Sequence, residues 1–282
     1  MNAGAWRWRR MATLIGMLAM FASPPSLAQS GQPWPTDARL SGNAFLTPGL
    51  KDLAQNPDSS PLSLWQDKGQ ALWTDSTQGR SCQSCHGTVD TLKAAATQFP
   101  KLSPKLSPKL STDGKQRLDL INLEDKIVNC RSRAGQPVAG LESDDVLALS
   151  ALLHSAAKGL PIDVKPPVAP GEKAPWQAHL SNGAKAYATR IGRLNLACMH
   201  CHDQSIGKQL RADVISPGNP TGFPVYRISW QTLGSIDRRL RACYSGVQAH
   251  VPPAGDPVLR ELELYLKVRA AGLAIEGPSL RR

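Results

Sequence analysis

Two short segments of the chain carry cysteine and histidine at a spacing that can do covalent chemistry. Both have the form Cys-x-x-Cys-His, one from Cys82 to His86 and the other from Cys198 to His202. Two thiols at this spacing can add to the two vinyl groups of a haem, and the histidine that follows lies under the iron as its proximal ligand. A zinc or redox Cys-x-x-Cys is the usual alternative, but two complete copies favour haem.

The sequence therefore predicts two covalently bound haem c groups. Their thioether bonds are expected at Cys82, Cys85, Cys198 and Cys201, and their proximal ligands are expected to be His86 and His202. His200 lies between the two cysteines of the second motif, where it cannot take the proximal place, and we interpret it as a surface residue.

The distal side of each iron needs a second ligand, and methionine is not available for it. Met1, Met11, Met17 and Met20 lie in the N-terminal leader, and Met199 lies inside the second motif. The remaining candidates are a lysine, His154, His179, His250, Cys130 and Cys243.

Cys130 and Cys243 follow the two motifs at matching positions. A thiolate ligand to each iron would account for this equivalence, and a Cys130–Cys243 disulfide is the alternative, because free thiols are unusual in an oxidising compartment. Thiolate ligation lowers the potential of a haem. Such a centre suits a catalytic thiol better than electron transfer at high potential.

The motifs belong to an internal repeat, which predicts a mainly α fold of two tandem c-type cytochrome domains that arose by duplication. Gly69 and Trp73 precede the first motif as Gly183 and Tyr187 precede the second. We expect the first domain at 29–162, a proline-rich linker at 163–175 and the second, catalytic domain at 176–282.

Apolar residues at helical spacing predict the framework of each domain. A helix is expected to begin at Pro61 and to carry Trp65, Gly69 and Trp73 on one face, and the segment from Trp176 to Tyr187 repeats this pattern. A glycine inside a helix costs roughly 1 kcal/mol, which is reasonable if it lets the last helix of the domain approach closely. Further helices are predicted after Ser143, with an end at Gly159, and from Pro257.

One stretch breaks this pattern. The segment 101–111 reads KLSPKLSPKLS, and a proline at every fourth position excludes a helix. We interpret it as an exposed insertion.

The N-terminal segment has the features of an export signal. Arg7, Arg9 and Arg10 precede an apolar stretch too short to span a bilayer, and small residues end it at Ala28. The interpretation is a signal peptide at 1–28, with no stable membrane anchor. Its removal lowers the formal net charge of +11 by three. The remaining basic bias suits an anionic substrate or an acidic partner, and the lack of a basic-aromatic array argues against nucleic acid.

Four segments together resemble the SoxA family, the larger subunits of the SoxAX cytochromes of bacterial sulfur oxidation. They are the first motif, the stretch from Ile121 to Arg131, the second motif, and the segment Arg239-Leu240-Arg241-Ala242-Cys243-Tyr244-Ser245-Gly246. The resemblance covers essentially the whole mature chain. Because both haem motifs are present, the chain resembles the two-haem members.

The resemblance implies a periplasmic L-cysteine S-thiosulfotransferase. Thiosulfate would be joined oxidatively to a cysteine of the carrier complex SoxYZ, and the electrons would leave through a SoxX-type cytochrome. It further implies that Cys243 ligates the catalytic haem, as a thiolate or a persulfide, and that Arg239 lies beside it.

The residues themselves agree with this chemistry. On a helix Arg239 and Cys243 lie one turn apart on the same face, where the guanidinium could bind a thiosulfate oxygen. We interpret Arg238 and Arg241 as a solvated basic face. A dihaem electron-transfer cytochrome without catalysis and a dihaem peroxidase remain as alternatives.

Overall fold

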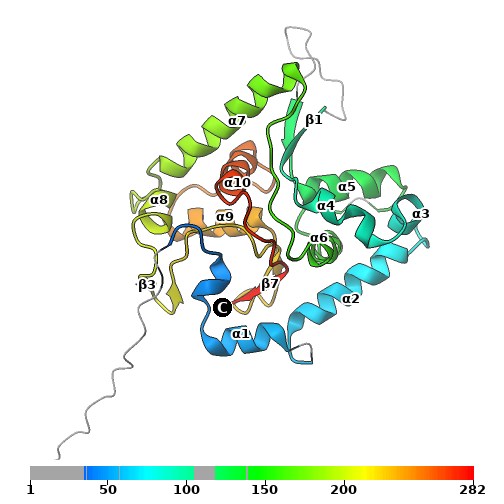
Figure 1. Cartoon of the computed structure of the whole chain (residues 1–282), viewed down its shortest axis with the longest axis horizontal. Coiled ribbons are helices and arrows are strands. Elements are labelled where there is room, and N and C mark those ends of the chain that lie inside the picture. Colours follow the sequence, from blue (N-terminus) through cyan, green and yellow to red (C-terminus); the bar gives the residue numbers. More distant parts are fainter. Residues whose placement is uncertain (1–34, 36, 57, 105–117, 138) are drawn as a thin grey trace, which may run out of the picture. The chain divides into compact units, whose positions relative to one another are not determined.

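The computed structural model describes residues 35–282 except 36, 57, 105–117 and 138. The predicted signal peptide and most of the KLSP repeat lie outside the described residues. Within the described part of the chain the fold is mainly α, as expected from the sequence (Figure 1). The helices are η1 (Gly42–Phe45), α1 (Pro48–Gln55), α2 (Pro61–Thr74), α3 (Cys82–His86), η2 (Val89–Leu92), α4 (Lys93–Ala96), α5 (Leu123–Arg133), α6 (Asp144–Ala156), α7 (Pro170–Ala188), α8 (Cys198–His202), α9 (Ile236–Gly246) and α10 (Pro257–Arg269).

The predicted helix starts are confirmed by their caps. Pro61 occupies the first turn of α2, and Pro257 occupies the first turn of α10, where the missing N–H costs nothing. The Ser143 side chain accepts a hydrogen bond from the Val146 N–H and caps α6. The chain leaves α6 near Gly159, whose φ of 86° suits glycine.

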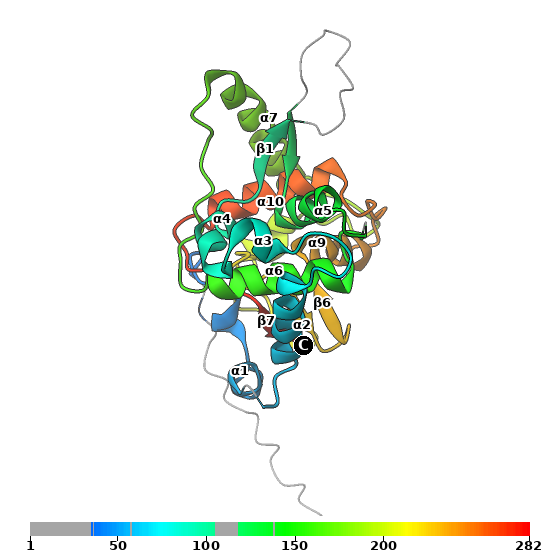
Figure 2. The same cartoon turned by 90° about the vertical axis from the view of Figure 1, so that its right-hand side faces the viewer.

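The two interrupting glycines allow close helix crossings, as predicted. A Cβ on Gly69 of α2 would lie 2.5 Å from the backbone oxygen of Ala148 in α6. A Cβ on Gly183 of α7 would collide with the backbone oxygen of Glu261 in α10. Each glycine therefore permits a contact between the first and the last long helix of its half, α2 with α6 and α7 with α10 (Figures 1 and 2).

The segment expected to be a linker is partly helical. Helix α7 begins at Pro170, so the last residues of 163–175 belong to its first two turns. Pro170 occupies the first turn, where proline is tolerated. Pro175 lies inside the helix, where it removes one hydrogen bond without ending it. Composition alone misplaced the boundary because prolines near a helix start do not exclude the helix.

The hydrophobic core joins the two halves of the chain. Trp73 and Leu149 of the first half pack in one cluster with Trp176, Leu264 and Ile275 of the second. A second cluster is built from α7, α9 and α10 around Tyr187, Leu240, Leu259 and Leu262. Residues 33–282 are one compact unit, so the halves share their interior rather than forming separate cores.

Short strands complete the fold. β1 (Lys101–Pro104) pairs antiparallel with β2 (Leu118–Ile121), so the first four residues of the predicted insertion are a strand. β3 (Gln209–Leu210) and β4 (Asp213–Val214) form a second hairpin. β5 (Val225–Arg227) pairs antiparallel with β6 (Thr232–Gly234) and parallel with β7 (Ser279–Arg281), which places Arg227 directly beside Arg281.

Candidate active site and haem cavities

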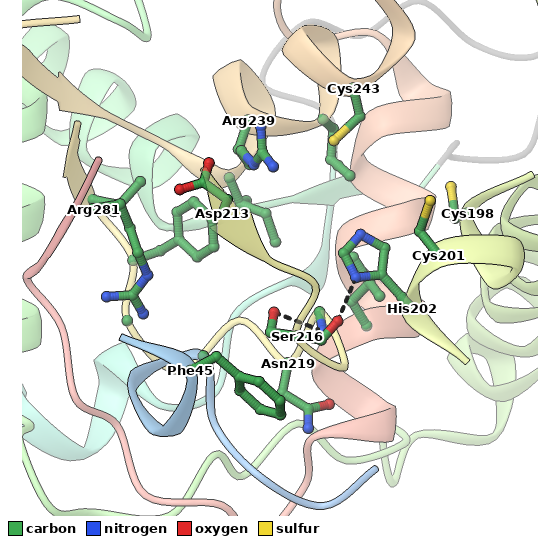
Figure 3. Close-up of a pocket in the computed structure, with 18 of the residues that line it drawn as sticks. Phe45, Cys198, Cys201, His202, Asp213, Ser216, Asn219, Arg239, Cys243 and Arg281 are labelled. Carbon is green, nitrogen blue, oxygen red and sulfur yellow. Dashed lines mark hydrogen bonds between the residues drawn. The ribbon is translucent and has the colours of Figure 1, made fainter. Parts of the chain in front are cut away.

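The second Cys-x-x-Cys-His motif faces a cavity of about 240 Å³. Cys198, Cys201 and His202 of α8 line one side, and Arg239 and Cys243 of α9 line another (Figure 3). These segments are far apart in the sequence. The structure therefore brings together every residue that the sequence predicted for the second haem and its reaction. We call this space the second cavity.

Helix α9 positions the two reactive residues. Ser235 caps the helix by accepting a hydrogen bond from the Arg238 N–H, and the helix buries Ile236 and Leu240 against the core. This anchoring turns Arg239 and Cys243, one turn apart, toward the second cavity, as the spacing predicted.

The proximal histidine of the second motif is held from behind. The His202 Nδ1 lies 2.8 Å from the carbonyl oxygen of Ser216, which fixes this nitrogen as the protonated one and leaves Nε2 for a metal. Gly218 lets the chain pass close to the ring, since a Cβ there would lie 3.0 Å from Nδ1. Its φ of 75° also suits glycine.

The surroundings of Cys243 favour its thiolate. Burial opposes ionisation, but the Arg239 guanidinium, the imidazole of His202 and the charge of Arg227 together lower the pKa of Cys243 to about 7. A thiolate is the form that attacks sulfur and binds metals. The lowered pKa thus suits Cys243 both as a nucleophile and as a ligand of an iron ion.

Three arginines that sequence reasoning missed also line the second cavity, namely Arg227, Arg281 and Arg282. Arg227 of β5 and Arg281 of β7 lie in register beside each other, and Figure 3 shows Arg281 with Arg239. Burial lowers the pKa of Arg281 to about 10, so the guanidinium stays charged at neutral pH. Asp213 also lines this cavity, and its Oδ2 lies 3.5 Å from Nη2 of Arg227. Arg227 and Arg281 are brought together by a parallel pair of strands from distant segments, so no local motif in the sequence indicates that they are neighbours.

The expectation for Arg238 and Arg241 was wrong. Both are half-buried rather than part of a solvated face. The Arg238 guanidinium stacks on the Trp230 ring at 4.5 Å and donates to the carbonyl oxygen of Leu233. Arg241 donates through Nε to the carbonyl oxygen of Pro252. The contacts of Arg238 and Arg241 with an aromatic ring and with carbonyl oxygens thus hold α9 in place.

His200 also differs from its interpretation as a surface residue. It is half-buried, and its Nδ1 lies 2.9 Å from the backbone nitrogen of Ala197, so it caps the helix that carries the second motif. The cap position of α8 is an alanine and has no side-chain acceptor of its own. His200 therefore positions the motif.

The first motif faces a separate cavity of about 180 Å³, which we call the first cavity. Cys82, Cys85 and His86 of α3 line it together with Cys130 of α5. Ser81 caps α3 by accepting from the Ser84 N–H at 3.1 Å. The structure again assembles all the residues that the sequence assigned to one haem.

The histidine alternatives for the distal ligands are not supported by position, whereas Lys101 and Lys126 line the first cavity, so a lysine stays an alternative to Cys130 there. His154 is buried next to Ser150, and His179 lies 2.9 Å from Glu261. Neither these nor the exposed His250 line the first or the second cavity. Cys130 and Cys243 line different cavities, and all six cysteines, which the structure describes, are free thiols. The disulfide alternative therefore fails.

Both cavities fit a haem c. Each offers two thiols at the spacing for attachment to the haem vinyl groups, and a histidine and a further cysteine that would ligate the iron. Arg131 lines the first cavity, and two of its buried nitrogens, Nε and Nη1, have no hydrogen-bond partner in the described structure. Such unpaired donors are expected where a group that carries carboxylates belongs. Among the described residues no helix is long and apolar enough to cross a membrane.

The fold and the two cavities define a c-type cytochrome. Residues 68–162 match the family model of the SoxA/TsdA cytochrome c domain. The chain is 32% identical to the L-cysteine S-thiosulfotransferase subunit SoxA of Pseudaminobacter salicylatoxidans, over 88% of this chain and 82% of that protein. It is 31% identical to the same subunit of Rhodovulum sulfidophilum, over 87% and 81%. The crystal structure of SoxXA from P. pantotrophus superposes with a TM-score of 0.73 at 28% identity, over 86% of both chains. The chain belongs to the SoxA family.

Proposed function

We propose that this protein is an L-cysteine S-thiosulfotransferase that joins thiosulfate to a cysteine of a SoxYZ-type carrier. The observation that carries the proposal is the second cavity, in which a cysteine whose thiolate is favoured lies with four arginines next to a haem-attachment motif. Relatives that the chain covers over most of their length have this activity in their names.

The reaction balances as a two-electron oxidation. A carrier thiol and a thiosulfate dianion give a carrier cysteine S-thiosulfonate, one proton and two electrons. One sulfur–sulfur bond forms and one S–H bond breaks. Haem c supplies an acceptor for single electrons when bound, and a SoxX-type partner cytochrome would carry them away.

The chain's own residues bind and orient the reactants. Arg239, Arg227 and Arg281 present guanidinium groups to the same space, which suits the oxygens of a thiosulfate anion. With the anion held there, its outer sulfur would meet Cys243, as thiolate or persulfide, and the carrier thiol would approach the same sulfur. In this proposal Cys243 is both nucleophile and distal iron ligand.

The first cavity would hold a second haem c with Cys130 as its distal ligand. The paired arrangement of motif, crossing helices and later cysteine in the two halves supports two tandem cytochrome domains that arose by duplication, share part of their hydrophobic core and meet before α7. The leader at 1–28 supports export to the periplasm. Both haems would stay attached through Cys82, Cys85, Cys198 and Cys201.

One experiment tests the function and the haem number together. The mature protein is expressed with a haem-attachment system, and its intact mass is expected to show two haems. It is then mixed with thiosulfate, the carrier and a partner cytochrome. The carrier is expected to gain the mass of one thiosulfonate group per two electrons. If the mass of the carrier stays unchanged while the protein still exchanges electrons, the proposal is wrong and the protein is an electron-transfer cytochrome.

A further inference from the structure

A third and much smaller cavity lies between the first and the second. Its volume is about 10 Å³, which is enough for about one water molecule. Phe99 and Leu123 line both this space and the first cavity, whereas Phe223 and Ile236 line both this space and the second cavity. We call it the central chamber. It shares a wall with each of the two haem cavities.

Titratable side chains form the other walls of the central chamber. Glu124 of α5, His154 of α6, and Glu263 and Lys267 of α10 line it, and each is at most 5% exposed. Ionised groups at this depth cost several kcal/mol each unless they are paired. Four such groups around one water-sized space are therefore not explained by packing.

Each carboxyl group of the chamber has a polar neighbour. The Ser150 hydroxyl donates to Glu124 Oε1 at 2.7 Å. The Asn122 amide donates to Glu263 Oε2 at 3.0 Å. Both donors are themselves fully buried. These bonds orient the two carboxyl groups but supply no positive charge.

Around the central chamber, carboxyl groups outnumber the positively charged side chains that are free to pair with them. Arg260 of α10 is already bound to Asp125 of α5 at 2.6 Å and to Asp237 of α9 at 2.8 Å. Lys267 is therefore the cation that lines the chamber itself, and its Nζ donates to the carbonyl oxygen of Pro220. Glu142, on the loop before α6, adds a further carboxyl group to the surroundings of Glu124 and brings no cation.

The titration behaviour follows from this shortage. Burial, and then the charge of Glu124, raise the pKa of Glu263 to about 8. Burial also raises the pKa of Glu124 and lowers that of Lys267. Burial and the nearby Lys267 lower the pKa of His154 to about 3, so this ring stays neutral. Both carboxyl groups of the chamber thus hold a proton more tightly than an exposed carboxyl group does.

We propose that the central chamber is a proton-binding site, in which Glu263 and Glu124 share a proton that is taken up when a haem in an adjoining cavity is reduced and released when it is reoxidised. An electron that enters an iron removes one positive charge nearby, which favours the protonated carboxyl group. The electron comes from the substrate couple or from a reductant of a redox titration, and the proton comes from solvent. The proposal rests on haem in the cavities and not on the sulfur chemistry.

Redox titration of the holoprotein at several pH values tests the proposal. The potential of at least one haem is expected to fall as the pH rises through about 8 and then to level off. In Glu263→Gln this fall is lost. The control Glu261→Gln, on the same helix, keeps the Oε1 acceptor for His179 and should behave like the wild type. Lys267→Gln removes the cation that lines the chamber, so the pH range of the fall should move upward. Potentials without this fall in the wild type, or with an equal fall in Glu263→Gln, would overturn the proposal.

Infrared difference spectroscopy gives a second measurement that needs no variant. At a pH just above 8, reduction of the wild type should produce the C=O band of a newly protonated carboxylic acid, and this band should shift in D₂O. It should be missing from Glu263→Gln and present in Glu261→Gln. A wild-type spectrum without the band contradicts the proposal even if Glu263→Gln fails to fold. Neither measurement uses thiosulfate or the carrier, so its outcome is independent of the proposed sulfur transfer.

Discussion

The first and second cavities are built on the same plan, and they differ in the groups that surround their cysteines. In each, a short motif helix faces a later helix that carries a cysteine, and a large aromatic residue of the crossing helix braces the motif. Trp73 donates through its ring nitrogen to the carbonyl oxygen of Gly87, and Tyr187 donates to the carboxylate of Asp203. Gly87 and Asp203 directly follow the two motif histidines.

The difference lies in the charge around the later cysteine. One turn before Cys243 stands Arg239, and two further arginines converge on the same space from β5 and β7. One turn before Cys130 stands Lys126, and Lys101, Arg80 and Arg131 also line the first cavity. Arginine offers a planar pair of donors for an oxyanion, whereas lysine is a hydrated point charge.

The features that the two cavities share serve haem binding, and those in which they differ serve catalysis. The motif, the crossing helices and the later cysteine are present in both cavities and are sufficient for a thiolate-ligated haem. An arginine one turn before the cysteine, Arg239, is present in the second cavity, whereas the first cavity has Lys126 at this place. The reaction needs an anion site next to its cysteine. We infer that catalysis depends on the arginines added to a shared haem-binding plan.

Replacement of each distal cysteine by alanine gives the largest expected difference between the two cavities. Cys243→Ala should abolish thiosulfate conjugation, because it removes the nucleophile, while both haems stay attached through their motif cysteines. Cys130→Ala should change the absorption spectrum of the first haem and lower turnover far less. Carrier mass spectrometry and haem spectra measure both. Near wild-type conjugation by Cys243→Ala would remove the distinction between the cavities.

Replacement of Arg239 tests the charge difference directly. Loss of one electrostatic anchor of a reacting anion typically costs 10²–10³ in rate, and we expect a loss of about this size for Arg239→Ala. Arg239→Lys makes the second cavity resemble the first and should recover part of the rate. The matched change Lys126→Ala should leave turnover within about twofold. If Arg239→Ala and Lys126→Ala lower the rate equally, the two cavities do not differ in their part in catalysis.

Arg281 is expected to act mainly in substrate binding. Arg281 is paired with Arg227 across β7 and β5 and is not on the helix of Cys243. Arg281→Gln should therefore raise the KM for thiosulfate by about tenfold with a smaller change in kcat, as for a contact made equally in the ground and transition states. Lys101→Gln, in the first cavity, serves as the control. A loss confined to kcat would instead place Arg281 next to the reacting sulfur.

The sequence predicted the haem-binding plan well because that plan is local. A five-residue motif, a repeated glycine and a cysteine at a matching distance can be read without knowledge of the fold. Arg239 was found for the same reason, since it shares a helical face with Cys243. Arg227 and Arg281 could not be found, because they meet through the parallel pairing of β5 and β7. The charged central chamber was missed because Glu124, Glu263 and Lys267 look like ordinary surface residues in sequence.

The glycine crossings should give effects of similar size in the two halves. Alanine at Gly69 or at Gly183 places a methyl group against the backbone of the facing helix. Overpacking of this kind typically costs 1–3 kcal/mol. We expect both variants to lose about that much stability in chemical denaturation, with haem still attached. A neutral Gly69→Ala beside a destabilised Gly183→Ala would show that only the second crossing is tight.

The smallest expected effect concerns the contact that joins the two regions. Glu142, on the loop before α6, accepts a hydrogen bond from the hydroxyl of Ser235, which caps the helix of Cys243. Burial raises the pKa of Glu142 to about 7, and its Oε2 is buried without a partner. The folded state therefore holds a proton that the unfolded chain releases at lower pH, so stability is lost as the pH rises from about 5 to about 7. Glu142→Gln should remove roughly 2 kcal/mol of this pH dependence. Calorimetric Tm values at pH 5 and pH 8 measure it, and an unchanged difference in Tm between wild type and variant would show that Glu142 is ionised in the folded protein.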